Sequence, residues 1–276
     1  MEVKIKAICI KSIDYKDNDS LITLASLERG KILSTVRGSK KQTSRLRFSA
    51  SLFCFGEYIL NVSKSGKYIV TGCDLIDSFI PIREDIDKFY LASLMLEILD
   101  KNLITPNDRL ILQTIKSIKA LCYNEVEEVS ATIEYVYRSM LISGYGFPKV
   151  ECKVCGKKSE LYFDETTLDF VCKTHKVNKG VLLKDSVIKG LQNVYEGEYN
   201  KLAQLDQSTK QNILYILVIY FEQISEIDIK TYKSYFDLVK GLYWYIQKLY
   251  IYYVYKQKNH IKRLKFISNY IIIIYM

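Results

Sequence analysis

Three cysteines and one histidine in the second half of the chain carry the spacing of a metal site. Cys152 and Cys155 are separated by two residues, Cys172 and His175 are also separated by two, and sixteen residues lie between the pairs. Two such pairs can fold toward each other and surround one ion with three thiolate sulfurs and one imidazole nitrogen, a ligand set typical of structural zinc. Because protein atoms fill all four positions, none is open for a catalytic water. The sequence therefore predicts one structural zinc ion.

The residues that flank the two pairs favour a zinc knuckle over a redox site. Gly156 follows the first pair and permits a tight backbone turn. Apolar residues between the pairs predict a small hairpin, formed by Tyr162, Phe163, Leu168 and Phe170. Nearby lysines would offset the negative charge of the thiolates: Lys153, Lys157, Lys158, Lys173 and Lys176. A redox role for Cys152 and Cys155 is the weaker alternative, because no thioredoxin-like βαβ pattern surrounds them.

A run of basic residues in the first half of the chain points to a polyanionic partner. The chain has a formal net charge of +9, and neutralising phosphates releases condensed counterions. Seven basic residues and no acidic residue lie in this run, and we predict that they contact nucleic acid: Arg29, Lys31, Arg37, Lys40, Lys41, Arg45 and Arg47. The alternative is a mobile, solvated loop whose lysines only aid solubility. A second basic stretch of seven residues begins at Lys240.

The first 80 residues predict a small β-barrel. Five segments rich in β-branched and aromatic residues are separated by mostly short connections: Val3–Lys11, Ser20–Leu27, Lys31–Val36, Leu52–Val62 and Lys67–Phe79. Five strands fit an OB-fold domain over residues 1–80, and an SH3-like barrel is the alternative. The longest gap, Gly38–Ala50, holds the densest part of the basic run. Period-two alternation places Phe53 and Phe55 on one face, and we expect both in the core.

After Pro81 the apolar residues recur at helical intervals. The pattern predicts helices at Arg83–Lys101, Leu110–Tyr123, Val126–Ser143, Gln207–Ile224 and Tyr232–Tyr255. We therefore expect residues 81–276 to form a mainly helical domain with the zinc-binding insertion at about 148–180, which makes the chain α+β. Seven aromatic residues crowd between Tyr243 and Tyr255. A core helix is the favoured interpretation of that stretch, and a stacking platform for bases is the alternative.

The sequence carries no motif of catalysis or of membrane insertion. It lacks a phosphate-binding loop, a Gly-x-Ser-x-Gly elbow and a His-Glu-x-x-His motif, and no apolar run approaches the roughly 20 residues that span a bilayer. His260 lies in a basic segment and is expected at the surface. The cysteines outside the metal pattern, Cys9, Cys54, Cys73 and Cys122, are typical of small buried residues in a reducing compartment. These features predict a cytoplasmic, non-enzymatic protein.

Several segments, in order along most of the chain, resemble the RecO family of bacterial recombination mediators. The N-terminal segments are Lys6–Ser12, Asn18–Leu24, Gly30–Ile32 with Val36–Gly38, and Ser44–Arg47. The later segments are Ile80–Asp85, Gly144–Pro148 leading to Cys152–Gly156, and Tyr250–Tyr255 followed by Lys262–Lys265. The ordered set is more specific than any of its members.

The resemblance implies both a fold and a function. It implies an N-terminal OB-fold, a helical domain that in many members carries a zinc knuckle, binding to single- and double-stranded DNA, and strand annealing. It also implies contacts with RecR and with single-stranded-DNA-binding protein, help in loading RecA, and a place beside the nucleoid. Two other hypotheses stay open: an RNA-binding accessory protein, because OB-folds also accept RNA, and a zinc-containing scaffold that binds no nucleic acid.

Overall fold

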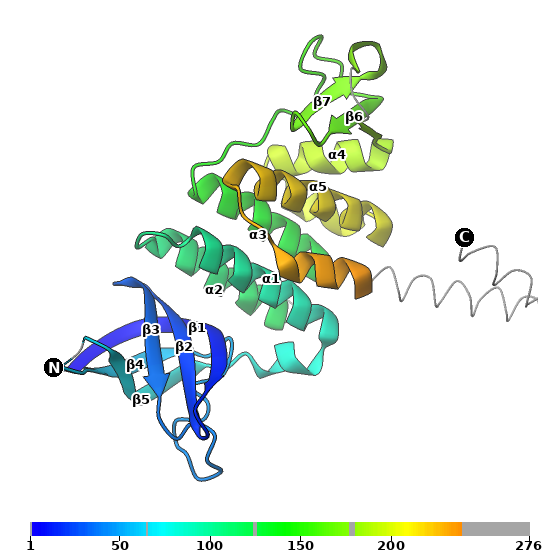
Figure 1. The fold of residues 1–276 in the computed structure, drawn as a ribbon. Helices are drawn as coiled ribbons and strands as arrows, with labels where there is room; N and C mark the ends of the chain where they lie inside the picture. The colour runs from blue at the N-terminus through cyan, green and yellow to red at the C-terminus, as the bar shows by residue number, and fades with distance from the viewer. Residues whose placement is uncertain (1, 65, 124–125, 177–179, 239–276) are drawn as a thin grey trace, which may run out of the picture. The chain divides into compact units, whose positions relative to one another are not determined.

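The computed structural model describes residues 2–64, 66–123, 126–176 and 180–238 (Figure 1). Residues 1–232 form one compact unit, and residues 233–276 are a second unit. The first unit contains a β-barrel, a set of helices and a small three-stranded sheet. The predicted aromatic helix and the second basic stretch lie mostly outside the described residues, although residues 230–238 are helical.

Five strands near the N-terminus close into a barrel in the order β1-β2-β3-β5-β4. They are β1 (Glu2–Tyr15), β2 (Asp19–Ser26), β3 (Gly30–Val36), β4 (Phe55–Val62) and β5 (Tyr68–Asp77). β1 pairs antiparallel with both β2 and β4, and a short parallel pairing of β3 with β5 closes the barrel. This order is that of an OB-fold, whereas an SH3-like barrel closes through antiparallel pairs. The OB-fold prediction is confirmed.

The barrel interior follows from the alternation of side chains along each strand. Every second residue of β2 points inward, so Ile22 and Leu24 are fully buried. They meet Ile32 and Val36 of β3 and Tyr58 of β4 in one apolar cluster. The residues between them face outward and form the outer surface of the barrel.

The helices follow the barrel in the chain. They are α1 (Ile86–Asn102), α2 (Asp108–Cys122), α3 (Glu128–Ile142), α4 (Asp185–Tyr195) and α5 (Gln207–Ser225). Polar side chains begin most of them: Asp85 accepts from two backbone N–H groups of α1, and Asn107 accepts from the Leu110 N–H of α2. None of the helices in the described ranges is long and apolar enough to cross a membrane.

The structure differs from the sequence prediction at Phe53 and Phe55 and at α4. Phe53 has a left-handed backbone (φ 68°) ahead of β4, so it does not share a strand face with Phe55. Its buried ring instead packs edge-on against Phe89 of α1, at a centroid distance of 5.8 Å. The prediction that both rings lie in the core is confirmed for Phe53, although not through a shared strand face, and is wrong for Phe55, which is only half-buried. A helix at Asp185–Tyr195 was also not predicted from the sequence.

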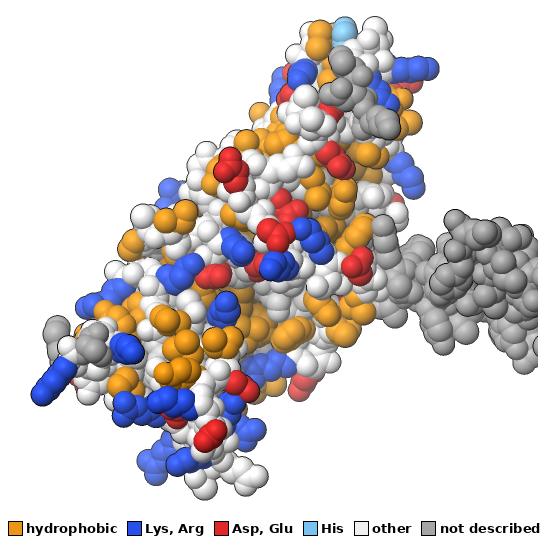
Figure 2. Space-filling view, in the orientation of Figure 1, with side chains coloured by type: hydrophobic (Ala, Val, Ile, Leu, Met, Phe, Trp, Pro, Cys, Tyr) orange, Lys and Arg blue, Asp and Glu red, His pale blue; other side chains and the backbone are white. Residues whose placement is uncertain are grey.

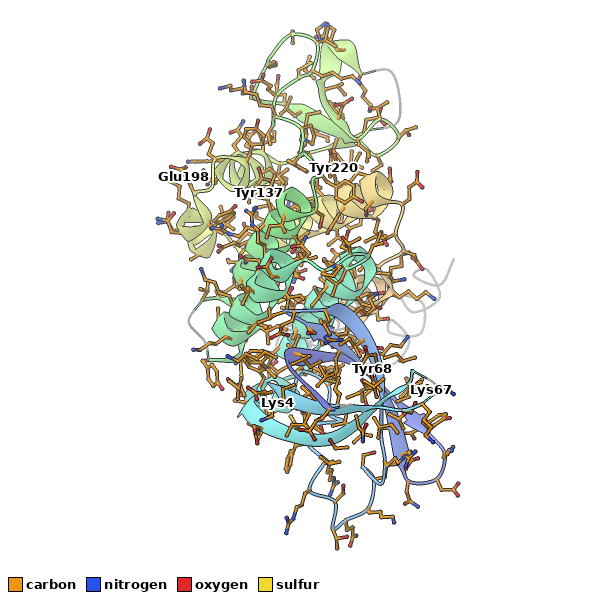
Figure 3. All side chains as sticks on the ribbon, turned by 90° about the vertical axis from the view of Figure 1, so that its left-hand side faces the viewer. Lys4, Lys67, Tyr68, Tyr137, Glu198 and Tyr220 are labelled. Carbon is orange, nitrogen blue, oxygen red and sulfur yellow. The ribbon has the colours of Figure 1, made fainter. Side chains whose placement is uncertain are left out.

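The small sheet forms the insertion between α3 and α4. It is ordered β7-β6-β8, with β6 at Leu161–Asp164, β7 at Asp169–Cys172 and β8 at Val181–Leu182. Phe147 joins this sheet to the helices: its ring contacts Phe170, Tyr137 of α3 and Tyr220 of α5, at centroid distances of 6.0, 6.0 and 4.9 Å. Figure 3 shows Tyr137 and Tyr220 at the helical end next to the insertion. The predicted hairpin between the cysteine pairs is confirmed as β6 and β7.

Candidate metal centre and nucleic-acid interface

The four predicted metal ligands converge at one end of the small sheet. Their ligand atoms all lie within 4.8 Å of one another. The Cys155 and Cys172 sulfurs are 3.8 Å apart, and the Nδ1 atom of His175 lies 3.5 Å from the Cys152 sulfur and 3.3 Å from the Cys172 sulfur. Three sulfurs and one imidazole nitrogen at these separations can surround a single tetrahedral metal ion.

The backbone around the first cysteine pair forms a knuckle. The Gly156 N–H donates to the Cys152 carbonyl at 2.8 Å, and Gly156 has the left-handed conformation (φ 71°) that this turn requires. Desolvation by burial opposes ionisation of the Cys152 thiol, but backbone N–H groups that donate to its sulfur outweigh burial and lower its pKa to about 5. Donors fixed by the fold therefore favour the thiolate, which is the form that binds metal.

The lysines near the knuckle do not all face the sulfurs. Lys153 forms an ion pair with Asp169, and Lys157 forms one with Glu160. The ammonium group of Lys176 lies 4.3 Å from the centroid of the Tyr162 ring. These contacts link residues at the surface of the hairpin. The positive charge of Lys153 and Lys157 is therefore divided between the thiolates and the neighbouring carboxylates.

The segment between β3 and β4, residues 37–54, is named the basic loop here. Five successive turns shape it, in which the N–H groups of Lys41, Ser44, Arg47, Ser51 and Cys54 donate to the carbonyl three residues earlier. Its chain is also packed on the barrel, because Leu46, Ala50 and Cys54 contact the apolar cluster inside. The basic loop thereby closes one end of the barrel.

Hydrogen bonds fix the first residues of the basic loop to the turn between β1 and β2. The Gly38 N–H donates to the Asp19 carboxylate at 2.8 Å, and the Lys40 N–H donates to the Asn18 carbonyl at 3.1 Å. The buried hydroxyl groups of Ser20 and Ser39 are 2.7 Å apart. These bonds position the start of the loop directly beside β2.

Tyr58 fixes the last part of the basic loop from inside the barrel. Its hydroxyl donates to the Ser49 and Cys54 carbonyls, at 3.0 and 3.3 Å. Burial raises the pKa of this hydroxyl well above its ordinary value, so the group stays protonated as a donor. In addition, the Phe53 N–H donates to the Cys9 carbonyl and the Cys9 N–H donates to the Cys54 carbonyl. The loop is thus anchored at both ends and at its centre.

Most cations of the basic loop face solvent. Four side chains are exposed and lie outside every carboxylate ion pair of the described residues: Arg37, Lys41, Arg45 and Arg47. Lys40 instead pairs with Asp14 at 2.7 Å. Figure 2 shows Lys and Arg side chains gathered over the barrel, at the lower left of the view. The four exposed cations stand on a fixed backbone and are available to phosphate.

Arg29 and Lys31 lie away from the other five predicted contacts. Arg29 lies in the turn between β2 and β3, Lys31 is the second residue of β3, and the six residues from Lys31 to Arg37 span roughly 20 Å. Lys31 forms an ion pair with Asp100 of α1 at 2.8 Å. The seven residues therefore do not form one surface. Arg29 and Lys31 lie far from the basic loop, and Lys31 links the barrel to α1.

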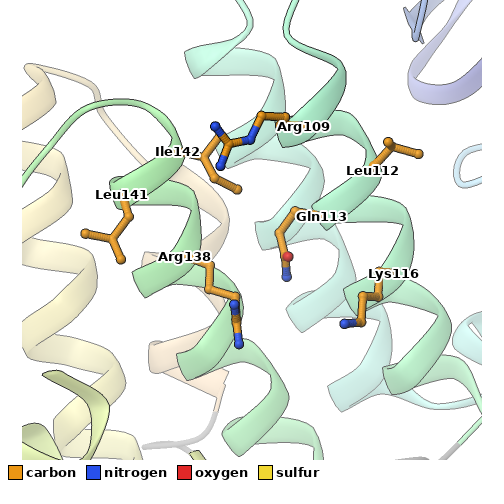
Figure 4. Close-up of a pocket in the computed structure, with 7 residues that line it drawn as sticks. All are labelled: Arg109, Leu112, Gln113, Lys116, Arg138, Leu141 and Ile142. Carbon is orange, nitrogen blue, oxygen red and sulfur yellow. The ribbon is translucent and has the colours of Figure 1, made fainter. Parts of the chain in front are cut away.

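A hollow of about 450 Å³ lies between α2 and α3 (Figure 4). Its apolar walls are Leu112 of α2 and Leu141 with Ile142 of α3. Polar side chains surround them: Arg109, Gln113 and Lys116 of α2, and Arg138 of α3. Arg138 is held by Glu134 at 2.6 Å and stacks on Tyr199 at 4.9 Å. No sequence pattern predicts this hollow, since its residues come from two helices and share no motif.

Comparison with known proteins identifies the family. Residues 1–79 match the family model described as Recombination protein O N terminal, and residues 83–233 match Recombination protein O C terminal. The chain belongs to the RecO family. The resemblance seen in the sequence is confirmed, and RecO membership covers both the barrel and the helices.

Curated RecO proteins of several bacteria are similar to the chain. DNA repair protein RecO of Clostridium novyi is 33% identical over 160 residues, which cover 56% of this chain and 61% of that protein. DNA repair protein RecO of Bacillus pumilus is 28% identical over 241 residues, which cover 84% of this chain and 93% of that protein. The similarity to the first relative thus spans less than two thirds of that protein, whereas the second is matched over nearly its whole length.

The convergence of four ligands predicts the effect of removing one of them. Cys152→Ser should abolish binding of one equivalent of metal per chain and lower the thermal stability of the helical part, because the ligand set holds two separate chain segments together. Cys122→Ser, which changes a buried cysteine outside the cluster, serves as the control. Metal content by elemental analysis and thermal melting by circular dichroism measure both effects. Unchanged metal content in Cys152→Ser would contradict this assignment.

Proposed function

We propose that this RecO-family chain is a non-enzymatic mediator of DNA repair. It binds single- and double-stranded DNA, promotes annealing of complementary strands, and with RecR helps to load RecA onto DNA coated by single-stranded-DNA-binding protein. The observation that carries the proposal is the basic loop, whose exposed cations stand on an anchored backbone at one end of an OB-fold. Chromosomal DNA as the ligand would place the protein in the cytoplasm, beside the nucleoid.

The proposed mechanism is electrostatic. Arg37, Lys41, Arg45 and Arg47 bind phosphates, and each neutralised phosphate releases condensed counterions. Because the turns of the basic loop are already formed, little conformational entropy is lost when DNA binds. Two strands held on one cationic surface repel each other less, which favours annealing. No step requires a bond to be broken, and none of the exposed cations acts as an acid or base.

We propose that the metal is one structural zinc ion. Zn–S bonds of about 2.3 Å and Zn–N bonds of about 2.0 Å at tetrahedral angles put two sulfurs about 3.8 Å apart and a sulfur and a nitrogen about 3.5 Å apart. The separations of 3.8, 3.5 and 3.3 Å in the structure fit these values. When bound, zinc would link the knuckle to the hairpin. Phe147 then transmits that order to α3 and α5 through its ring contacts.

The hollow between α2 and α3 is the site that we propose for single-stranded-DNA-binding protein. An acidic peptide tail of that partner would pair with Arg109 and Lys116, and an apolar residue would enter between Leu112 and Ile142. This use of the helices leaves the basic loop free for DNA. RecR is expected to bind elsewhere on the chain.

Two alternative functions predict different results in the binding experiments. An RNA-binding accessory protein would prefer a single-stranded RNA over the DNA of the same sequence in a competition assay, since the 2′-hydroxyl is what distinguishes the two. A zinc-containing scaffold would bind neither at low salt. The basic loop favours the DNA function over the scaffold, because four unpaired cations on one short segment repel each other until an anion binds.

Removing the four exposed cations of the basic loop should weaken DNA binding and its salt dependence. For Arg37→Ala, Lys41→Ala, Arg45→Ala and Arg47→Ala combined, the slope of log affinity against log salt should fall by about 0.7–0.9 for each lost phosphate contact. Fluorescence anisotropy with labelled single-stranded DNA over a salt series measures it. The matched control removes four exposed lysines in or beside the helices: Lys101, Lys119, Lys184 and Lys189.

The two variants separate the possible sites. Loss of affinity and slope only in the loop variant supports the proposal. Equal binding by wild type and the loop variant would place the DNA site elsewhere, and a loss confined to the control would place it on the helices.

The hollow predicts a charge-dependent interaction with the acidic tail. Arg109→Glu combined with Lys116→Glu should reduce the affinity for a peptide with the tail sequence of single-stranded-DNA-binding protein at least about tenfold, because attraction becomes repulsion at two positions. Anisotropy of the labelled peptide measures the change. DNA binding by the same variant should be unaltered, and a peptide affinity equal to that of wild type would exclude the hollow as the binding site.

A further inference from the structure

One sulfur of the metal cluster is open to solvent, whereas the other two are not. Cys155 is exposed, Cys152 and Cys172 are buried, and His175 is half-buried. Around Gly156, no atom other than those of its chain neighbours lies within 4 Å of the position that a side chain would occupy. The knuckle therefore presents the Cys155 sulfur to small molecules in solution.

A smaller hollow beside the knuckle also admits solvent. It has a volume of about 250 Å³, and the residues that line it belong to the knuckle and to β7. Cys152, Gly156 and Phe170 are among them, together with the ion pair of Lys153 and Asp169. A reagent of the size of a few water molecules can thus reach the edge of the cluster from this side as well.

The exposed sulfur has a second sulfur close to it. The sulfurs of Cys155 and Cys172 are 3.8 Å apart. A disulfide bond is about 2.05 Å long, so the two atoms need to approach each other by about 1.8 Å. Because the two residues belong to different cysteine pairs, a bond between them would replace the metal as the link between the knuckle and β7.

Backbone hydrogen bonds hold the knuckle against the hairpin without any metal. The Lys153 N–H donates to the Phe170 carbonyl at 2.9 Å, and the Cys152 N–H donates to the Lys157 carbonyl at 2.7 Å. These bonds involve no sulfur, so they can persist when the sulfurs change partners. The same backbone can therefore carry either a metal-bound or a disulfide-bonded cluster.

We propose that Cys155 and Cys172 are a peroxide-sensitive pair, which forms a disulfide on oxidation and thereby releases the metal. The inference rests on the proposed structural zinc ion and goes beyond the proposed role in DNA repair. Cys155 meets the oxidant because it is exposed, and Cys172 completes the reaction from its buried position. Only Cys152 and His175 then remain as ligands, which are too few to hold zinc tightly.

Hydrogen peroxide supplies the oxidising equivalents. The Cys155 thiolate attacks one peroxide oxygen, the O–O bond breaks and hydroxide leaves, which gives a sulfenic acid on Cys155. The Cys172 thiolate then attacks that sulfur, the S–S bond forms, the S–O bond breaks and a second hydroxide leaves. The two sulfurs lose two electrons to the peroxide, and two protons from solvent convert the hydroxides to water. A dithiol reductant reverses the reaction by thiol–disulfide exchange.

The test treats the full-length, zinc-loaded protein with hydrogen peroxide. A chromogenic chelator measures the released zinc, and mass spectrometry of proteolytic peptides maps the disulfides. One zinc ion should be released for each Cys155–Cys172 bond that forms, and reduction with dithiothreitol should restore zinc binding. Cys155→His keeps four ligands in a Cys₂His₂ set, and it should release zinc at least about tenfold more slowly, because the exposed thiolate is gone.

The control is Cys73→Ser, because Cys73 is the cysteine outside the cluster that is not fully buried. It should release zinc at the wild-type rate. Zinc retained under peroxide, a bond between Cys152 and Cys155, or release without any disulfide would overturn the proposal. If Cys155→His binds no zinc, the disulfide map of the wild type still decides. The zinc content before treatment tests the metal assignment separately, and a wild-type protein that binds no zinc would overturn that assignment and this inference together.

Discussion

The closure of the barrel end by the basic loop is the constraint on which the proposed DNA site depends. A five-stranded barrel leaves apolar side chains open at its ends, and here Leu46 and Ala50 cover one of them. With these residues pointing inward, the neighbouring Arg45 and Arg47 face solvent. Tyr58 adds a buried donor that fixes the carbonyl positions of the loop. The same folding energy that completes the core therefore also positions the cations.

Features of the fold that depend on residues close in the sequence could be predicted from it. The cluster of Cys152, Cys155, Cys172 and His175 was predicted because these residues come in two pairs of close neighbours, and the knuckle needs only Gly156 and a short hairpin to bring the pairs together. The strands were predicted because side-chain alternation is a local signal. The ends of β1 differ most: it continues to Tyr15, beyond the predicted Lys11, because it pairs with β4 first and with β2 afterwards.

Features that depend on contacts between residues far apart in the sequence could not be predicted from it. Lys31 looks like its basic neighbours in the sequence, but its partner Asp100 is 69 residues away. The hollow between α2 and α3 needs the packing of two helices. The alternation of Phe53 and Phe55 misled because a left-handed residue interrupts the strand pattern. Tertiary pairing, rather than residue type, assigns these side chains their roles.

Hydrogen–deuterium exchange combined with DNA binding of Tyr58→Phe tests most directly whether the anchored backbone matters. This change leaves every cation in place and removes only the donor to Ser49 and Cys54. The account predicts faster amide exchange in the basic loop, unchanged protection of the strands, and weaker DNA affinity with the wild-type salt slope. Faster exchange in the loop with unchanged DNA affinity would contradict it, because charge alone would then be sufficient.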